Sequence, residues 1–362
     1  MSALDMIVGA ALRGRPNRAH HERPGRPRSA APTTIQVGGL GLFGALLLVS
    51  ILAAAAFASW LPLQISIVTV FLFAGPHNWF ELRYFLMRLP VRFGRSRNFF
   101  VTAFAGLGVL TLAYVSLPFV YNARPGTDEA WSTIIAGWNT GLLFWLGLLV
   151  WLRSRQKRRA NWTWTIPVAL ALCSLNWLGP DVFSLALVYV HPLIALWFLD
   201  RHLRRTRPEW LRVYRRFLCL VPLVLAGMIW RLSQTSGLPD SNGLFWRITQ
   251  HSGADIFPQV SSHLLVSVHL FLELLHYGVW IFALPLIGGL AGARVWEVKT
   301  VPVAQHPRGF PRVVGALLIA ALAGVVVLWF GFAIDYSTTR DIYFTVAMAH
   351  VLAEAPFLLR MI

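Results

Sequence analysis

Histidine and glutamate residues recur inside long apolar stretches of this sequence, where an ionisable side chain is costly to bury. The residues concerned are His77, Glu81, His191, His269, Glu273, His276, His350 and Glu354. Imidazole nitrogens and carboxylate oxygens are ligands that iron, copper, manganese and zinc accept in proteins. The pattern therefore predicts a metal site buried among apolar segments.

The spacing of these residues places imidazole and carboxylate groups on shared helix faces, because residues three or four apart lie on one face. The pairs with this spacing are His77–Glu81, His269–Glu273, Glu273–His276 and His350–Glu354. Each pair can direct both side chains at one point. The Glu-x-x-His arrangement is also how some helical bundles present ligands to di-iron carboxylate centres.

Ten apolar stretches could form the helices that carry these residues. They cover residues 36–60, 62–87, 99–120, 131–152, 162–178, 182–199, 217–235, 262–291, 313–334 and 342–359. Most are long enough to cross a hydrocarbon layer of about 30 Å. Hydrophobic residues make up 56% of the chain and charged residues only 13%, which excludes a soluble globular enzyme. The sequence predicts an all-α, polytopic integral membrane bundle of about ten transmembrane helices.

The expected depth in the membrane is similar for residues from several of these helices. Measured from the outer helix ends, the residues expected near the middle are His191, Glu273, His276 and His350. His77 is expected slightly further in. Glu81 and Glu354 follow about one turn deeper, roughly 6 Å at a rise of about 1.5 Å per residue. Histidines from four helices are therefore expected to converge on one plane, with two carboxylates on its inner side.

Positive charge follows the expected topology. Most of the 32 lysine and arginine residues lie in the N-terminal tail and in alternate connections near residues 88–97, 153–159, 201–216 and 294–312. This alternation predicts that both termini are cytoplasmic, and the Arg- and Ala-rich composition favours a bacterial inner membrane. The basic residues form no single patch, so we expect no nucleic-acid partner.

The domain organisation predicted from composition is simple. Residues 1–34 are expected to form a disordered basic cytoplasmic tail, and residues 35–362 a single transmembrane helical domain. The two cysteines, Cys173 and Cys219, both lie in apolar runs, which excludes a disulfide scaffold and a cysteine-ligated zinc site. His202 falls in a basic cytoplasmic connection, where we expect it to be solvated.

The side chains of the predicted site have different expected roles. Four residues are expected to be metal ligands: His77, His191, His276 and His350. Three carboxylates are expected to act in catalysis, by completing the coordination, bridging or moving protons: Glu273, Glu81 and Glu354. Four further side chains are expected beside the ligands or along a substrate path: His269, Tyr189, Trp79 and Tyr277.

A buried site of this kind is reached more easily from lipid than from water. Iron bound by histidine and carboxylate with an open position is a common device for activating dioxygen. The sequence therefore favours a non-haem iron oxygenase, hydroxylase or desaturase that acts on a lipid-like substrate, with membrane lipids and a redox protein as partners. The alternatives are another transition metal, a haem b-binding or assembly protein, a proton-coupled transporter, and histidines that only link helices.

Overall fold

The computed structural model describes residues 37–90, 93–123, 126–156, 161–239, 243–287, 296–306 and 309–361. Within these ranges the structure contains helices and no strand, and its only strand-like feature is an isolated bridge between Thr300 and Phe310. The all-α prediction is therefore confirmed for this part of the chain. The expected basic tail, residues 1–34, lies outside the described residues.

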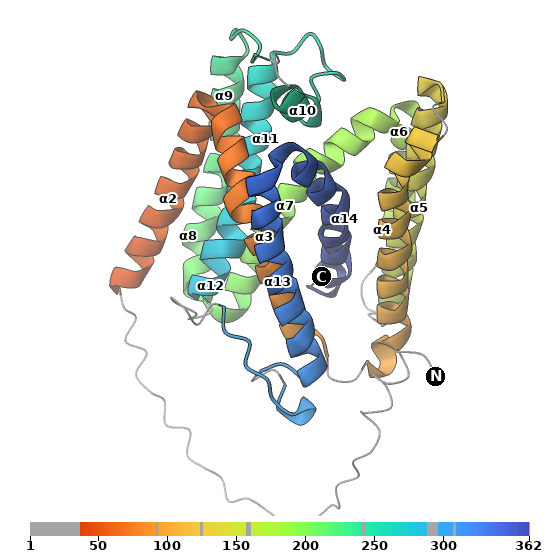
Figure 1. Cartoon of the computed structure of the whole chain (residues 1–362). Helices are drawn as coiled ribbons and strands as arrows, with labels where there is room; N and C mark the ends of the chain where they lie inside the picture. The colour runs from red at the N-terminus through yellow and green to blue at the C-terminus, as the bar shows by residue number, and fades with distance from the viewer. Residues whose placement is uncertain are drawn as a thin grey trace, which may run out of the picture.

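The helices coincide closely with the apolar stretches (Figure 1). Their bounds are α2 Val37–Trp60, α3 Pro62–Arg88, α4 Arg97–Ala123, α5 Asp128–Gln156, α6 Thr165–Leu178, α7 Pro180–Thr206, α8 Pro208–Leu218, α9 Leu220–Leu232, α10 Gly243–His251, α11 Ser262–Tyr277, α12 Leu284–Ile287, α13 Arg312–Ile334 and α14 Tyr336–Met361. Single 3₁₀ turns cover Gly94–Ser96 and Val303–Gln305. The stretch predicted at 217–235 is part of a broken helix, because α8 and α9 meet at Cys219.

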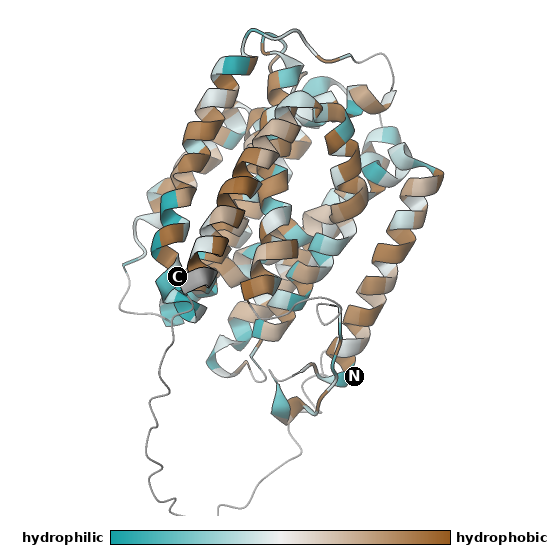
Figure 2. Cartoon of the chain, turned by 90° about the vertical axis from the view of Figure 1, so that its left-hand side faces the viewer, coloured by the Kyte–Doolittle hydropathy of each residue, from teal (hydrophilic) through white to brown (hydrophobic). Residues whose placement is uncertain are grey.

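Eight helices of the described chain are long and apolar enough to cross a membrane, and they make this an integral membrane protein. Two of the ten predicted spans are not among them. The polar residues of α3, which include His77, Asn78 and Glu81, lower its hydropathy. Helix α6 has only 14 residues, or about 21 Å at about 1.5 Å per residue. Figure 2 shows hydrophobic residues along the shafts of the helices and much of the hydrophilic colour near their ends.

Helix α3 runs through the middle of the bundle despite its polar residues. It packs against α13 on one side and against α11 on the other. Helix α11 in turn contacts α2, α7 and α9, while α14 packs on α4 and α5. The polar helix α3 is therefore enclosed by more apolar helices, which shield its ionisable side chains from lipid.

The span Ser262–Ile287, which begins with α11, is the most enclosed of the eight, since 61% of its most apolar stretch of 18 residues is buried. Its helical geometry changes directly after the predicted site residues. Residues Gly278–Ala283 form a π-helical segment, and α12 follows with Pro285, which has no N–H to bond the carbonyl of Ile281. Such wide turns often occur at functional positions in helices.

Candidate metal centre

Helix α3 presents His77 and Glu81 one turn apart on its buried face. Each of the two residues is only 1% exposed. The Nδ1 atom of His77 donates a hydrogen bond to the carbonyl oxygen of Phe73, at 2.9 Å. Because Nδ1 carries the proton, the Nε2 atom of His77 has a free lone pair. A backbone carbonyl that fixes a histidine in this way is typical of histidines that bind metals.

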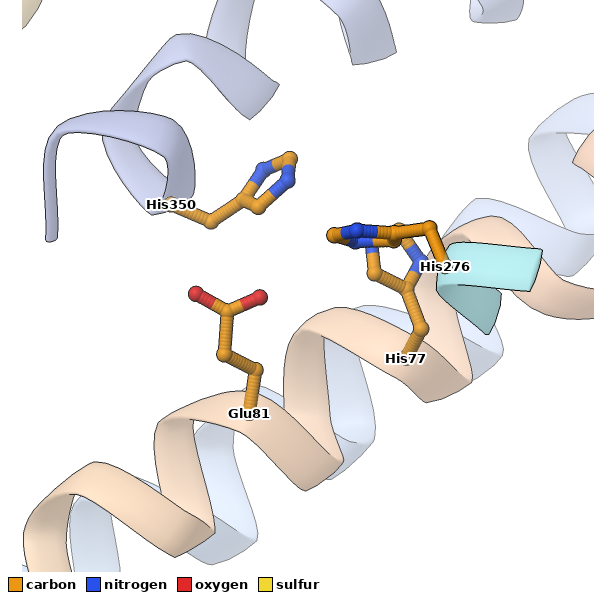
Figure 3. A group of neighbouring side chains, drawn as sticks. All are labelled: His77, Glu81, His276 and His350. Atoms are coloured by element: carbon orange, nitrogen blue, oxygen red, sulfur yellow. The ribbon is translucent and has the colours of Figure 1, made fainter. Parts of the chain in front are cut away.

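Helices α11 and α14 bring His276 and His350 to the same place. One ligand atom from each of His77, Glu81, His276 and His350 lies within 4.8 Å of the others. The ring centroid of His77 lies 5.4 Å from that of His276 and 5.1 Å from that of His350. Figure 3 shows the three imidazoles and the carboxylate directed into a common space from three helices. We call these four residues the α3 group.

A second set of ligands overlaps the first at His276. It consists of His191 from α7, His276, and Glu354 from α14, whose ligand atoms also lie within 4.8 Å of one another. The Nδ1 atom of His191 lies 3.2 Å from a carboxylate oxygen of Glu354. Its Nε2 atom lies 3.2 Å from the Nε2 atom of His350. We call this set the α7 group; the two groups share His276 and together contain four histidines and two glutamates.

Three carboxylate oxygens of the two groups are buried without a hydrogen-bond partner. They are both oxygens of Glu81 and the Oε1 atom of Glu354. A buried polar group without a partner costs roughly 1–3 kcal/mol, and a charged one costs more. Carboxylate oxygens only accept, so a cation is the kind of ligand that would compensate them.

The donor set suits a transition metal. It contains imidazole nitrogen and carboxylate oxygen and no thiolate, because both cysteines lie elsewhere on α6 and at the α8–α9 junction. Metal ions of the non-haem iron type accept this mixture and tolerate open coordination positions. The α3 group alone could supply four ligands to such an ion.

One predicted catalytic carboxylate belongs to neither group. Glu273 lies beside His269, with 3.8 Å between Oε1 and the His269 Nε2 atom. Both residues line a small polar pocket together with Ser66, His251 and Arg340. The Glu273–His276 pair therefore does not direct both side chains at one place, because Glu273 faces this pocket and His276 faces the metal ligands.

Of the other residues predicted to lie beside the ligands, the structure places some there and some elsewhere. Tyr277 does contact a ligand, since its ring centroid lies 4.4 Å from that of His77. Tyr189 lies beside His269, at 5.4 Å between rings, and its hydroxyl oxygen lies 3.0 Å from the carbonyl oxygens of both Ser252 and Leu265, which share its one proton. Trp79 donates to the carbonyl oxygen of Leu318 on α13 and so ties α3 to α13.

Sequence reasoning missed two polar residues of the interior. Arg340 is only 4% exposed and lies in the pocket with Glu273, although its position near a predicted helix end favoured solvent. The expectation that His202 is solvated is wrong. This histidine is 8% exposed and accepts a hydrogen bond from Arg88 through its Nδ1 atom, at 2.9 Å. Its spacing of eleven residues from His191, about three helical turns, was the available signal.

Comparison with protein-family models, with curated proteins and with solved structures gave no match. The assignment of function consequently depends on the geometry and chemistry of the site.

Proposed function

We propose that this protein is an integral-membrane, metal-dependent oxidoreductase, of the non-haem iron oxygenase, hydroxylase or desaturase type. The observation that carries the proposal is the α3 group, in which three histidines and one glutamate from three helices converge. Both carboxylate oxygens of Glu81 are buried there without a hydrogen-bond partner. A bound metal ion would compensate these atoms at once, which hydrogen bonds between helices do not.

In this proposal the α3 group binds the metal, and the α7 group orients the side chains next to it. His77 is held by Phe73 so that its Nε2 atom faces the ion. Glu354 orients His191, which lies against His350. His191 and Glu354 could also bind a second ion together with His276. Iron in such a site supplies dioxygen activation when it is bound. The pair His269–Glu273 lies further out and can hold a proton near the site.

The proposed substrate is hydrophobic and comes from the lipid. Buried aromatic side chains lie beside the ligands: the ring centroid of Tyr277 is 4.4 Å from that of His77, and that of Trp280 is 6.5 Å from that of His276. Such surroundings exclude water from the reacting groups and favour a lipid-like molecule over a polar one. An oxygenase also needs electrons, so the proposal includes a redox partner. We further propose ten transmembrane crossings, with both termini in the cytoplasm of a bacterial inner membrane.

Metal analysis of the detergent-purified protein tests this function. Plasma mass spectrometry and a visible spectrum would compare the wild type with the variant His276→Ala/His350→Ala, purified without chelators. We expect about one or two irons per chain in the wild type, and loss of iron in the variant. His263→Ala is the matched control, because His263 also lies on α11 but bonds the carbonyl oxygen of Ser59, away from the site.

The other outcomes are equally informative. A Soret band in the wild type would replace the oxygenase with a haem b protein, since two facing histidines can also hold haem. No metal in any sample would refute the metal site and favour a proton-coupled transporter, in which the same His and Glu residues relay protons. Equal loss in His263→Ala would show that the variants lose metal because they unfold.

A further inference from the structure

A second group of polar side chains lies next to the metal ligands, towards the end of the bundle where α3 and α7 finish. Its members are Tyr84 and Arg88 of α3, His202 of α7 and Trp280 of the π-helical segment, and we call them the Arg88 cluster. The guanidinium carbon of Arg88 lies 4.2 Å from the ring centroid of Tyr84. The Tyr84 ring lies 5.9 Å from that of His202 and 5.4 Å from that of Trp280.

The unpartnered atoms of the Arg88 cluster can all donate a hydrogen bond. Arg88 only donates, so the Nδ1 atom of His202 must accept from it, and the proton of neutral His202 must be on Nε2. That Nε2 atom has no partner, and neither has the indole Nε1 of Trp280, while the hydroxyl of Tyr84 can accept from Arg88 and still donate its own proton. His202 is 8% exposed and Trp280 only 1%. The missing ligand must therefore offer acceptor atoms.

Charge indicates the same kind of ligand. Arg205, on the last turn of α7, is close enough to repel Arg88, and Arg360 of α14 is close enough to repel Arg205. Across the described residues, neither Arg88 nor Arg205 forms an ion pair with a carboxylate. A partly buried arginine without a counter-ion is unfavourable unless an anion joins it.

The Arg88 cluster continues the same helix faces that carry the metal ligands. Tyr84 and Arg88 follow Glu81 by three and seven residues, so the three residues share one face of α3. Trp280 connects the two places, because its ring centroid lies 6.5 Å from that of His276 and 5.4 Å from that of Tyr84. The unpartnered carboxylates of the metal ligands are acceptors, whereas the unpartnered atoms of this cluster are donors. The two places therefore select ligands of opposite charge.

We propose that the Arg88 cluster binds a phosphate-type oxyanion, with Arg88 as the charged anchor and Tyr84, His202 and Trp280 as neutral donors. The guanidinium group of an arginine matches a phosphate with two parallel hydrogen bonds. The phosphate can belong to the headgroup of an anionic lipid or be free in solution. Arg205 is exposed at the rim and attracts either one. This site does not depend on a metal being bound next to it.

Binding assays on the detergent-purified full chain test the proposal with two probes, phosphatidylglycerol and inorganic phosphate. Native mass spectrometry would measure the lipid and calorimetry the phosphate, with diacylglycerol as the lipid that lacks phosphate. We expect one saturable phosphate-bearing ligand per chain and no binding of diacylglycerol. Saturation by phosphatidylglycerol alone would identify a lipid headgroup, and saturation by inorganic phosphate would identify a free anion.

Variants distinguish binding at the Arg88 cluster from nonspecific attraction of anions to positive charge. Arg88→Gln is expected to weaken binding about tenfold or more, and Tyr84→Phe, which removes only a hydroxyl, about threefold. Arg201→Gln is the matched control, because Arg201 is the neighbour of His202 but lies over Trp197, at 5.0 Å. Absence of saturable binding of both probes would overturn the proposal, as would equal weakening by Arg88→Gln and Arg201→Gln. Metal content of the same samples reports on the metal centre independently.

Discussion

The carboxylate of Glu81 combines complete burial with the absence of any hydrogen-bond partner for either oxygen. Such a group destabilises the metal-free fold and gains a strong partner when a cation binds. Glu81→Gln keeps the shape and removes the charge. We therefore expect two opposite effects: metal content falls at least tenfold, while the melting temperature of the metal-free protein stays equal or rises. Plasma mass spectrometry and thermal unfolding of chelator-treated samples would measure the two effects.

Glu209→Gln is the control for this experiment, because Glu209 lies at the start of α8 and its side chain is 43% exposed in a 4.0 Å pair with Arg207. Removal of its charge should change neither quantity, since exposed ion pairs contribute little. A lower melting temperature of metal-free Glu81→Gln would mean that the carboxylate has a stabilising partner inside the fold. Unchanged metal content would remove Glu81 from the ligand set.

At the scale of helices, the contact between α3 and α13 determines where His77 can lie. Gly75 precedes His77 by two residues, and a Cβ atom added there would lie 2.8 Å from the Cγ1 of Val325. Val325 is β-branched and cannot turn away easily. Gly75→Ala should therefore push α3 from α13, lower the melting temperature and reduce metal content by displacing His77. Metal analysis and thermal unfolding of the purified variant would measure both changes.

A compensating change makes this prediction specific. Val325→Ala removes the methyl groups in the way, so the double variant Gly75→Ala/Val325→Ala should recover metal that Gly75→Ala alone has lost. Gly324→Ala on α13 is the control, because nothing lies within 4 Å of the added Cβ atom there. It should be neutral or slightly stabilising, since alanine favours a helix over glycine by about 1 kcal/mol. Failure of the double variant to recover metal would exclude helix displacement as the cause.

Helical periodicity explains which parts of the site could be predicted and which could not. The four-residue spacing of His77 and Glu81 was sufficient to place both on one face, and apolar patterning was sufficient to give the helix positions. Spacing does not say how far a helix is rotated about its axis. Glu273 consequently faces His269 and the pocket with Arg340, whereas His276, three residues later, faces the metal ligands. That choice depends on how α11 packs against α2, α3 and α7, which are distant from it in sequence.

The position of His202 shows a second limit of prediction from sequence. His202 follows an apolar stretch in a strongly basic segment, and this composition is typical of a solvated connection. The structure extends α7 to Thr206 and places His202 against Arg88 of α3. The break of the helix at Cys219 is different, because Pro222 has no N–H to bond the carbonyl of Leu218 and its ring crowds that carbonyl. The position of His202 thus depends on tertiary packing that local composition does not encode, whereas the sequence does contain a signal for the break.

For the whole molecule, the number of crossings determines on which side each connection lies. If α3 and α6 both cross, residues 124–127 are outside and residues 153–159 are inside. If neither crosses, only the region between them is inverted, and the two connections exchange sides. Figure 1 shows α3 running along the bundle beside α13, which favours the first topology. The five basic residues between positions 153 and 159 favour it too, because such residues stay in the cytoplasm.

Thiol labelling of whole cells distinguishes the two topologies. Single cysteines at Thr127→Cys and Ser154→Cys would be introduced into a background of Cys173→Ser and Cys219→Ser, and treated with a membrane-impermeant maleimide. With ten crossings, Thr127→Cys reacts in intact spheroplasts and Ser154→Cys reacts only after permeabilisation. The reverse result would mean that α3 does not cross. His77 and Glu81 would then lose the mid-membrane position from which a lipid-soluble substrate was inferred, even if they still bind a metal.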